Sequence, residues 1–580
     1  MLETTLSTSF SPGTNIKGQV AGANWSFLLP CLELDRTVCI GAPPLTTLTT
    51  LSRLNREVIV TCRNTRQAQA VHALGQKNNL ANVHTTSSRD HLAVSSSSSA
   101  DLVLIVGWRN TRRFSRNRAL MADIQRLLKP EGLIYFESTW LSSDQVGDGR
   151  NHDPGSSQLL WLTPLTGEMQ TAVPRQDAGI IDYFLRHRLY TPSANVPILD
   201  KVERFLNSHA FFGQFSRRYG ALVGQEVDSQ QQRRPHQPPR YLCQIARAAN
   251  VDIDHHRWAL SARGRYNSRK VLFFLFEEAS SSPEYIVKIT RDSAFNARLE
   301  NEYHALTLLD QKGLGGPETL PQPLFLDCHG GLAIVGETVI DGVPFRQRTT
   351  GTADDPYGRV AIEWLTDLSI ATADSTMATA SKVAEELWQL FVRFLETYCL
   401  TLEQTVFLAE QIDIIRRHLG TFPLVFQHGD PGTWNLMVTS GGEVAFLDWE
   451  AAEPHGMPLW DLFYFLRSYC TWAARKQGTR DSLKGFAQHF LAESSLTPLL
   501  IKAIRRYSRQ IGLPPRLIEP LFYTCWMHRA LKQATRLSPA RLEKGHYVNL
   551  LRLCIDRRNT PELDRLFQTY KSAFGDGGSD

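Results

Sequence analysis

Three side chains with oxygen donors lie close together in the C-terminal half of the sequence: Asp430, Asn435 and Asp448. They are five and thirteen residues apart, and the apolar run Val-Ala-Phe-Leu directly before Asp448 is typical of a buried strand. Phosphoryl transfer needs a carboxylate that orients and deprotonates the accepting hydroxyl, and oxygen ligands that hold Mg²⁺ against the nucleotide phosphates. One carboxylate, one amide and a second carboxylate can meet these needs. The pattern therefore indicates metal-assisted phosphoryl transfer.

The motifs around these residues follow one another in a defined order. His-Gly-Asp-Pro-Gly-Thr-Trp-Asn ends at Asn435, and Leu-Asp-Trp-Glu ends at Glu450. Protein kinases also have an Asp-x-x-x-x-Asn loop followed by a strand that ends in a second Asp, although there the strand ends in Asp-Phe-Gly. Together the two motifs resemble the aminoglycoside phosphotransferase and choline kinase family of small-molecule kinases, over about residues 255–550.

The resemblance implies a role for each of these side chains. Asp430 would be the catalytic base, Asn435 and Asp448 the magnesium ligands, and His428 a residue that braces the loop. Asp461, at the end of Gly-Met-Pro-Leu-Trp-Asp, resembles a structural Asp of the family and is left out of the catalytic set. The alternative is that His-Gly-Asp forms a turn and Asp448 closes a strand in an unrelated fold.

Two charged residues upstream are candidates for nucleotide binding. The segment Ile-Val-Lys-Ile around Lys288 resembles the strand whose lysine contacts the α- and β-phosphates, and Glu302 resembles its helical ion-pair partner. Glu300 is the competing candidate. We prefer Glu302 because Leu306 and Leu309 follow it at four and seven residues, so they would bury the helix while Glu302 turns toward the cleft.

A short polar segment and a hinge complete the expected nucleotide site. Asn267, in Gly-Arg-Tyr-Asn-Ser, lies where the family places a loop that covers the nucleotide, and it is a candidate phosphate donor. A plain hairpin turn is the alternative there. Residues 337–339 follow an apolar strand at the expected hinge, where backbone groups would bind the base. ATP and another nucleoside triphosphate therefore both remain open as the cofactor, together with Mg²⁺.

The elements that must position these residues form a small mixed lobe followed by a helical one. Apolar runs from Val271, Glu284 and Gly331 predict strands, with a helix around residues 294–309 between the last two. From Ala384 onward the pattern is mostly helical. This order predicts a two-lobed, kinase-like domain.

The N-terminal part has a different pattern of apolar segments. Five short apolar runs between Thr37 and Ser138 alternate with amphipathic stretches, of which residues 65–77 and 117–128 have helical spacing. This βαβ alternation predicts a Rossmann-like, doubly wound parallel sheet with a binding crevice at the carboxyl ends of its strands. The fold class is therefore α/β, with this sheet ahead of the kinase-like domain.

The same region resembles class I S-adenosylmethionine-dependent methyltransferases, most closely in the turn Leu-Lys-Pro-Glu-Gly that begins at Leu128. Its first turn, Ile-Gly-Ala-Pro-Pro, has one glycine where the family has several, and the two prolines stiffen it. Arg63 stands where a carboxylate would accept hydrogen bonds from the ribose hydroxyls. We therefore expect a degenerate module that does not use S-adenosylmethionine; a working methyltransferase is the alternative.

The length of the chain predicts more than one domain. A chain of 580 residues exceeds one domain of about 150 residues. We predict a methyltransferase-like domain with appended helices at 1–225, a linker at 226–240, a kinase N-lobe at 241–345 and a kinase C-lobe at 346–580.

The charge and cysteine patterns narrow the classes of partner. A net charge of +5 is too small to indicate nucleic-acid binding, and no apolar run approaches the length of a transmembrane segment. The N-terminus lacks a basic region followed by an apolar one, and nine cysteines are scattered without a Cys-x-x-Cys pair. These features predict a cytoplasmic protein with reduced thiols.

The acceptor is the least specified part of the function. Residues 501–549 contain ten basic residues against two acidic ones, which argues against a polycationic acceptor and favours a neutral or anionic small molecule or glycan. Solvated helix faces are the alternative explanation of these charges. We therefore predict an enzyme, an ATP- and Mg²⁺-dependent kinase of a hydroxyl group. A bifunctional kinase and methyltransferase, and a pseudokinase scaffold, are the alternative functions.

Overall fold

The computed structural model describes most of the chain, in two compact units. The described residues are 20–87, 96–114, 117–138, 157–164, 167–175, 177–186, 218–224, 237–262, 270–375, 378–418 and 422–567. The N-terminal unit comprises Met1–Glu300 and Pro323–Val339, and the C-terminal unit comprises Asn301–Gln322 and Ile340–Asp580. Most of the predicted linker and the whole candidate loop around Asn267 lie outside the described residues. The predicted domain boundaries stay predictions.

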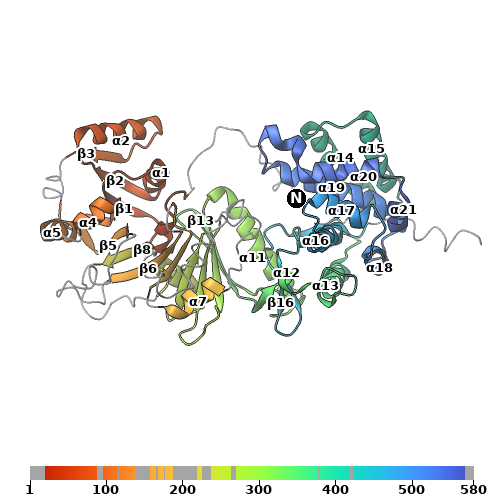
Figure 1. The fold of residues 1–580 in the computed structure, drawn as a ribbon, viewed down its shortest axis with the longest axis horizontal. Coiled ribbons are helices and arrows are strands. Elements are labelled where there is room, and N and C mark those ends of the chain that lie inside the picture. Colours follow the sequence, from red (N-terminus) through yellow and green to blue (C-terminus); the bar gives the residue numbers. More distant parts are fainter. Residues whose placement is uncertain are drawn as a thin grey trace, which may run out of the picture. The chain divides into compact units, whose positions relative to one another are not determined.

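The first half of the N-terminal unit is a doubly wound α/β sheet (Figure 1). Its parallel strands pair in the order β3-β2-β1-β4-β5, which confirms the predicted Rossmann-like fold. These strands are β1 (Leu34–Ile40), β2 (Asn55–Thr61), β3 (Val83–Thr86), β4 (Ala100–Ile105) and β5 (Leu128–Ser138). The helices between them are α1 (Leu45–Leu54), α2 (Thr65–Lys77), α4 (Trp108–Phe114) and α5 (Arg118–Leu127).

Local sequence fixes where two of these helices begin. The Asn64 side chain accepts a hydrogen bond from the backbone N–H of Gln67, and the Asn117 side chain accepts one from Leu120. Each asparagine thereby caps a helix N-terminus. The predicted helix bounds 65–77 and 117–128 are reproduced to within one residue.

The sheet continues beyond β5 with antiparallel strands. These are β8 (Arg218–Gly224), β6 (Ser157–Thr163) and β7 (Thr171–Pro174). Strand β7 then pairs with β9 (Arg257–Ser261), and the order runs on through β10 (Lys270–Phe276), β11 (Tyr285–Thr290), β13 (Leu332–Thr338) and β12 (Pro323–His329). The strands expected for the kinase N-lobe thus belong to one sheet with the Rossmann-like strands, and thirteen strands of this sheet lie among the described residues. Two further helices of the unit are α7 (Ala178–Arg186) and α10 (Arg240–Ala248).

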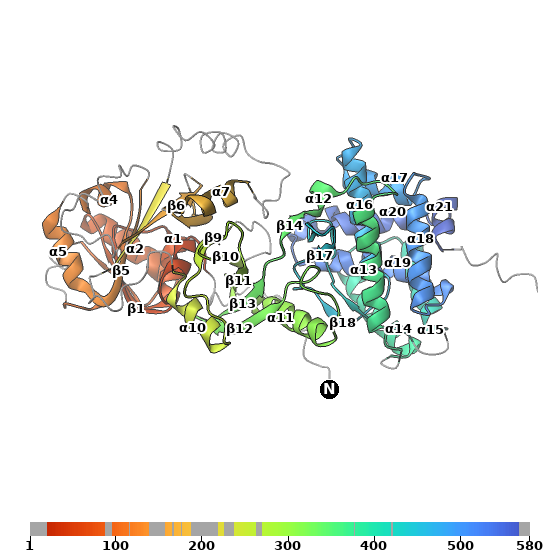
Figure 2. The ribbon, with the colours of Figure 1, turned by 90° about the horizontal axis from the view of Figure 1, so that it is seen from below.

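Helix α11 (Asn296–Gln311) leads into the C-terminal unit, which is mostly helical (Figure 2). Its longer helices are α13 (Pro356–Thr372), α14 (Ala380–Thr397), α15 (Leu402–Arg416), α16 (Trp460–Lys476), α18 (Thr497–Gln510) and α19 (Ile518–Ala534). Shorter ones are α12 (Phe345–Arg348), α17 (Ser482–Phe490), α20 (His546–Asp556) and α21 (Pro561–Phe567). Two small sheets join β14 (Gly342–Pro344), β16 (Leu436–Thr439) and β17 (Val444–Phe446), and β15 (Val425–Gln427) with β18 (Glu453–Gly456).

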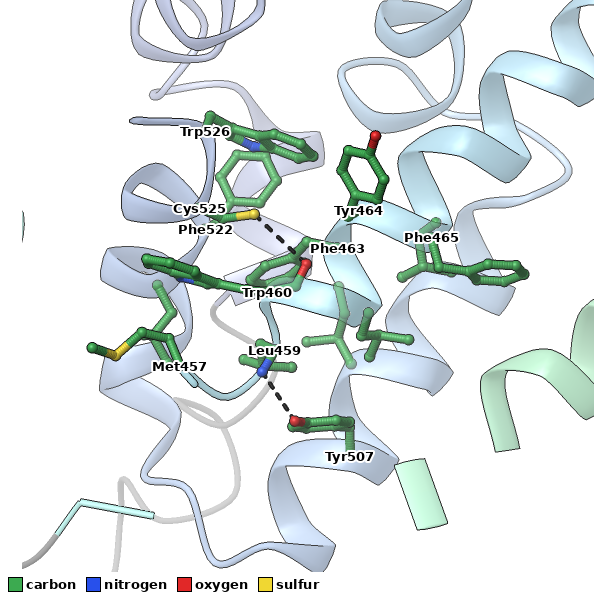
Figure 3. Close-up of a cluster of buried hydrophobic side chains, with 14 of the residues drawn as sticks. Met457, Leu459, Trp460, Phe463, Tyr464, Phe465, Tyr507, Phe522, Cys525 and Trp526 are labelled. Carbon is green, nitrogen blue, oxygen red and sulfur yellow. Dashed lines mark hydrogen bonds between the residues drawn. The ribbon is translucent and has the colours of Figure 1, made fainter. Parts of the chain in front are cut away.

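The core of the C-terminal unit is built around α16 and α19. Phe463 of α16 and Phe522 of α19 pack edge to face with their ring centroids 5.3 Å apart, and Phe522 also packs against Trp526 (Figure 3). At the start of α16, the backbone N–H of Leu459 donates to the Tyr507 hydroxyl at 3.1 Å. Burial of large aromatic side chains on both helices fixes them against each other. Among the described residues, no helix is long and apolar enough to cross a membrane.

Candidate active site

Residues 428–435, here called the Asp430 loop, connect β15 to β16. The loop needs a glycine at its second position: Gly429 has φ +76, and a Cβ atom there would lie 1.9 Å from the carbonyl oxygen of Ala451. This close approach brings the loop against the segment that follows Asp448.

His428 braces the loop through both ring nitrogens. The backbone N–H of Asp430 donates to His428 Nδ1 at 3.2 Å, so the proton resides on Nε2, which donates to the carbonyl oxygen of Leu447 at 3.0 Å. Burial lowers the pKa of His428 and keeps the ring neutral, although the Asp461 carboxylate opposes this shift. The ring also packs on Trp449, with centroids 4.3 Å apart. His428 thereby ties Asp430 to the strand that ends next to Asp448.

Asp461 anchors the same loop from the first turn of α16. Its carboxylate accepts the backbone N–H of His428 at 2.6 Å and that of Gly429 at 3.2 Å. Both donors belong to the loop backbone, so Asp461 shapes the loop. This agrees with the structural role that the resemblance implies.

Asn435 is oriented by Asp430. Its side-chain Nδ2 donates to the Asp430 carbonyl oxygen at 2.9 Å and to Asp430 Oδ2 at 3.3 Å. Because the amide nitrogen is used in this way, the amide oxygen points away from Asp430 and can serve as a ligand. The structure therefore brings the predicted base and one predicted metal ligand together.

Asp448 follows β17 in a left-handed backbone conformation, with φ +67. A non-glycine residue in this region is uncommon, and such residues cluster at functional sites. The adjoining backbone is held by Glu302, which is fully buried and accepts the N–H of Trp449 at 3.1 Å. Asn301 donates to the carbonyl oxygens of Glu450 and Ala452. Helix α11 thus fixes the conformation around Asp448.

The donor set fits magnesium. No group of three or more His, Cys, Asp or Glu side chains that could hold a metal occurs within the part of the chain that the structure describes. A metal at Asp448 and Asn435 would therefore need oxygens from elsewhere. Magnesium characteristically binds through one or two carboxylates together with phosphate oxygens and water.

Lys288 lies in the N-terminal unit, on β11. Its Nζ pairs with Glu337 Oε1 at 2.5 Å, and both residues are buried. Glu337 of β13 stands opposite Ile286, two residues before Lys288 on the same face of the sheet. The sequence indicated only a hinge at Glu337 and missed this contact. The pairing of Lys288 with Glu302, and the preference for Glu302 over Glu300, stay predictions.

Sequence reasoning also missed two side chains on α19. Arg529 Nη1 lies 3.8 Å from Asp430 Oδ1, and its guanidinium covers the Tyr464 ring with Cζ 3.5 Å from the centroid. Lys532 Nζ donates to the carbonyl oxygen of Gly429 at 3.3 Å. Both belong to the basic stretch 501–549, and their spacing of three residues on a helix was the available signal. By contrast, Arg506 of α18 pairs with Glu363 of α13 at 2.7 Å.

In the Rossmann-like sheet, an asparagine side chain packs on the turn that follows β1. Gly41 follows β1 with φ +98, and the Asn110 side chain packs on this turn. Asn110 Nδ2 donates to the Val106 carbonyl oxygen at 2.7 Å and to that of Ile40 at 3.3 Å. It thus ties together the carboxyl ends of β1 and β4, where a cofactor would approach a doubly wound sheet. Arg63 is exposed just beyond the end of β2.

Comparison with known proteins gives one family and several solved structures. No curated protein matches the chain. Similar structures include the bifunctional kinase-methyltransferase WbdD, with 11% identity over 90% of this chain and 88% of that one at a TM-score of 0.24. Aminoglycoside phosphotransferase APH(3'')-Id from Streptomyces rimosus is 14% identical over 49% of this chain and 97% of its own at a TM-score of 0.28. The YcgJ protein from Bacillus is 14% identical over 34% and 94% at 0.22. Residues 267–488 of the chain match the model of the phosphotransferase enzyme family, within the region that resembles small-molecule kinases in sequence.

Proposed function

We propose that this protein is a kinase that transfers the terminal phosphoryl group of ATP, or of another nucleoside triphosphate, to a hydroxyl group of a small molecule or glycan. The observation that carries the proposal is the Asp430 loop, in which a carboxylate is held by three separate groups within the region that matches the phosphotransferase family. His428 holds the Asp430 backbone, Asp461 holds the preceding backbone, and Asn435 contacts the carboxylate itself.

Asp430 acts on the acceptor. Its carboxylate accepts a hydrogen bond from the attacking hydroxyl and orients the oxygen toward the terminal phosphorus. It takes the proton as the new oxygen–phosphorus bond forms and the bond from that phosphorus to the bridging oxygen breaks, which releases the nucleoside diphosphate. Arg529 places a positive charge 3.8 Å from Asp430 Oδ1. Together, a held carboxylate and a neighbouring cation suit a step in which positioning and electrostatics supply most of the catalysis.

Asp448 and the amide oxygen of Asn435 would hold Mg²⁺, which when bound neutralises charge on the nucleotide phosphates. The left-handed conformation of Asp448 and the hydrogen bond from the Trp449 N–H to Glu302 hold the backbone that carries this side chain. Lys288 and Glu302 are the further residues that we propose for nucleotide binding.

For the N-terminal unit we propose docking or substrate capture without methyl transfer. The single glycine of the first turn, the Asn110 side chain packed on it and the exposed Arg63 all support this. Each feature removes a group that S-adenosylmethionine would need, or occupies its approach.

The test is a screen of the full chain for nucleotide consumption and phosphoryl transfer to pooled metabolites and glycans, in the presence of Mg²⁺. We expect at least one pool to become phosphorylated, and chelation of Mg²⁺ to stop the transfer. A protein that binds nucleotide but phosphorylates no pool would support the pseudokinase alternative instead.

A further inference from the structure

Two arginines of the C-terminal unit lie beside the Asp430 loop with no carboxylate partner among the described residues. Arg467 of α16 is 6% exposed, and its Nη1 contacts His546 Nε2 at 2.9 Å. Its Nε is buried without a hydrogen-bond partner in the described part of the chain. Burial lowers the pKa of His546 to about 4, so the ring is neutral and its Nε2 accepts the hydrogen bond from Arg467 without neutralising the guanidinium charge.

Arg346 of α12 is the second arginine. Its Nε donates to Thr433 Oγ1 in the Asp430 loop at 2.9 Å, and its guanidinium carbon lies 5.2 Å from the ring centroids of both Trp434 and Trp472. Burial, with the nearby charges of Arg475 and Arg467, lowers the pKa of Arg346 to about 10. Neither arginine forms an ion pair with a carboxylate among the described residues, and the two charges together raise the local positive potential.

Side-chain contacts link Arg346 and Arg467 to the Asp430 loop. The Arg467 guanidinium lies 5.3 Å from the Tyr464 ring centroid, and that of Arg529 lies 3.5 Å from it. Arg529 in turn approaches Asp430 to 3.8 Å. On the other side, the Thr433 hydroxyl is 2.9 Å from Ser468 of α16, which fixes the end of the loop that Arg346 contacts. Arg346 therefore contacts the Asp430 loop directly, and Arg467 contacts Tyr464, whose ring packs on Trp434 of the loop with centroids 6.0 Å apart.

Aromatic contacts alone do not account for this arrangement. Cation–π contacts offset part of the cost of burying a guanidinium, but buried charges in proteins are normally paired or bind an ion. Arginine is also the side chain best suited to bidentate recognition of phosphate and carboxylate groups. An anion at this position would supply both the missing counter-charge and the acceptor for Arg467 Nε.

We propose that Arg346 and Arg467 bind an anionic group of the acceptor, a phosphate or carboxylate carried by the same molecule as the accepting hydroxyl. This inference rests on the proposed kinase function and narrows its substrate class to sugar phosphates, uronic acids and similar anionic hydroxyl compounds. It assigns recognition of the acceptor to these two arginines and not to Arg506 of the basic stretch 501–549, which is paired with Glu363.

The experiment measures binding of inorganic phosphate to the full chain by calorimetry, with and without a saturating non-hydrolysable ATP analogue and Mg²⁺. We expect phosphate to bind in both conditions and to bind more weakly as salt is added. Arg346→Gln should lower the affinity at least about tenfold, the range expected for loss of a charge-assisted contact. Arg467→Lys should also lower it, because lysine cannot reproduce the planar guanidinium. The matched control Arg506→Gln should leave it unchanged.

Several outcomes would overturn the inference. They are absence of phosphate binding to the native protein, an equal affinity in Arg346→Gln, and loss of phosphate binding when the nucleotide analogue is present, which would assign the anion to the nucleotide site. If Arg467→Lys fails to fold by circular dichroism, Arg346→Gln decides, since Arg346 is only partly buried. Failure of the ATP analogue to bind would count against the kinase proposal alone, because phosphate is also titrated without it.

Discussion

Four neighbouring residues contact the backbone of the Asp430 loop or the Asp430 carboxylate. His428 and Asp461 fix the backbone of its loop, while Asn435 and Arg529 approach its carboxylate oxygens. The types and spacing of Asp430, Asn435 and Asp448 could be read directly from the sequence. Arg529 could not, because it lies almost one hundred residues later, on a helix whose packing brings it to the loop.

The substitution Asp448→Ala should abolish Mg²⁺-dependent nucleotide binding, because one of the two proposed metal ligands is lost. Nucleotide affinity is measured by calorimetry across a Mg²⁺ titration. Glu443→Ala is the control, since Glu443 is an exposed carboxylate in the turn just before β17. A Mg²⁺ dependence in Asp448→Ala equal to that of the native protein would remove Asp448 from the metal site.

The elements that carry the site were predicted with unequal success. Helix α2 and strands β10 and β11 follow from hydrophobic periodicity: α2 has the predicted bounds, and each strand begins within one residue of its predicted start. Strands β9 and β12 were not predicted, because their short sequences carry polar residues and no clear alternation. The contact of Glu302 with the backbone next to Asp448 was not predicted: its carboxylate accepts the N–H of Trp449, while Glu302, Leu306 and Leu309 are all buried.

The packing of α16 on α19 should stabilise the whole C-terminal unit. Phe463→Ala should lower the free energy of unfolding by about 3–5 kcal/mol, the range for removing a buried phenylalanine from a packed core. Chemical denaturation followed by circular dichroism measures the change. Leu402→Ala should alter stability by less than about 0.5 kcal/mol, because Leu402 is 80% exposed. Equal effects of the two substitutions would contradict the described core.

At the scale of the molecule, the main feature that the sequence did not reveal is the continuous sheet, of which thirteen strands lie among the described residues. The join between β7 and β9 rests on two residue pairs, Thr171 with Ser261 and Ala172 with Leu260. These residues are about ninety positions apart, and local periodicity carries no information on such long-range pairing. The alternation of strands and helices in the N-terminal part was nevertheless predicted, as were the small-lobe strands that begin near Val271, Glu284 and Gly331.

The N-terminal unit should not bind S-adenosylmethionine. Calorimetry on the full chain tests this, with Asn110→Ala as a second sample to ask whether clearing the turn after β1 creates binding. We expect no heat of binding from the native protein. A dissociation constant in the low micromolar range would favour the bifunctional alternative.

The central claim is that Asp430 is the base of a phosphotransferase, and the turnover of Asp430→Asn tests it most directly. Turnover is compared with that of the native protein at saturating nucleotide and Mg²⁺, with an acceptor found in the screen. We predict a decrease of at least about a hundredfold, the lower range for a general base, with nucleotide affinity unchanged. Turnover equal to that of the native protein would contradict the assignment.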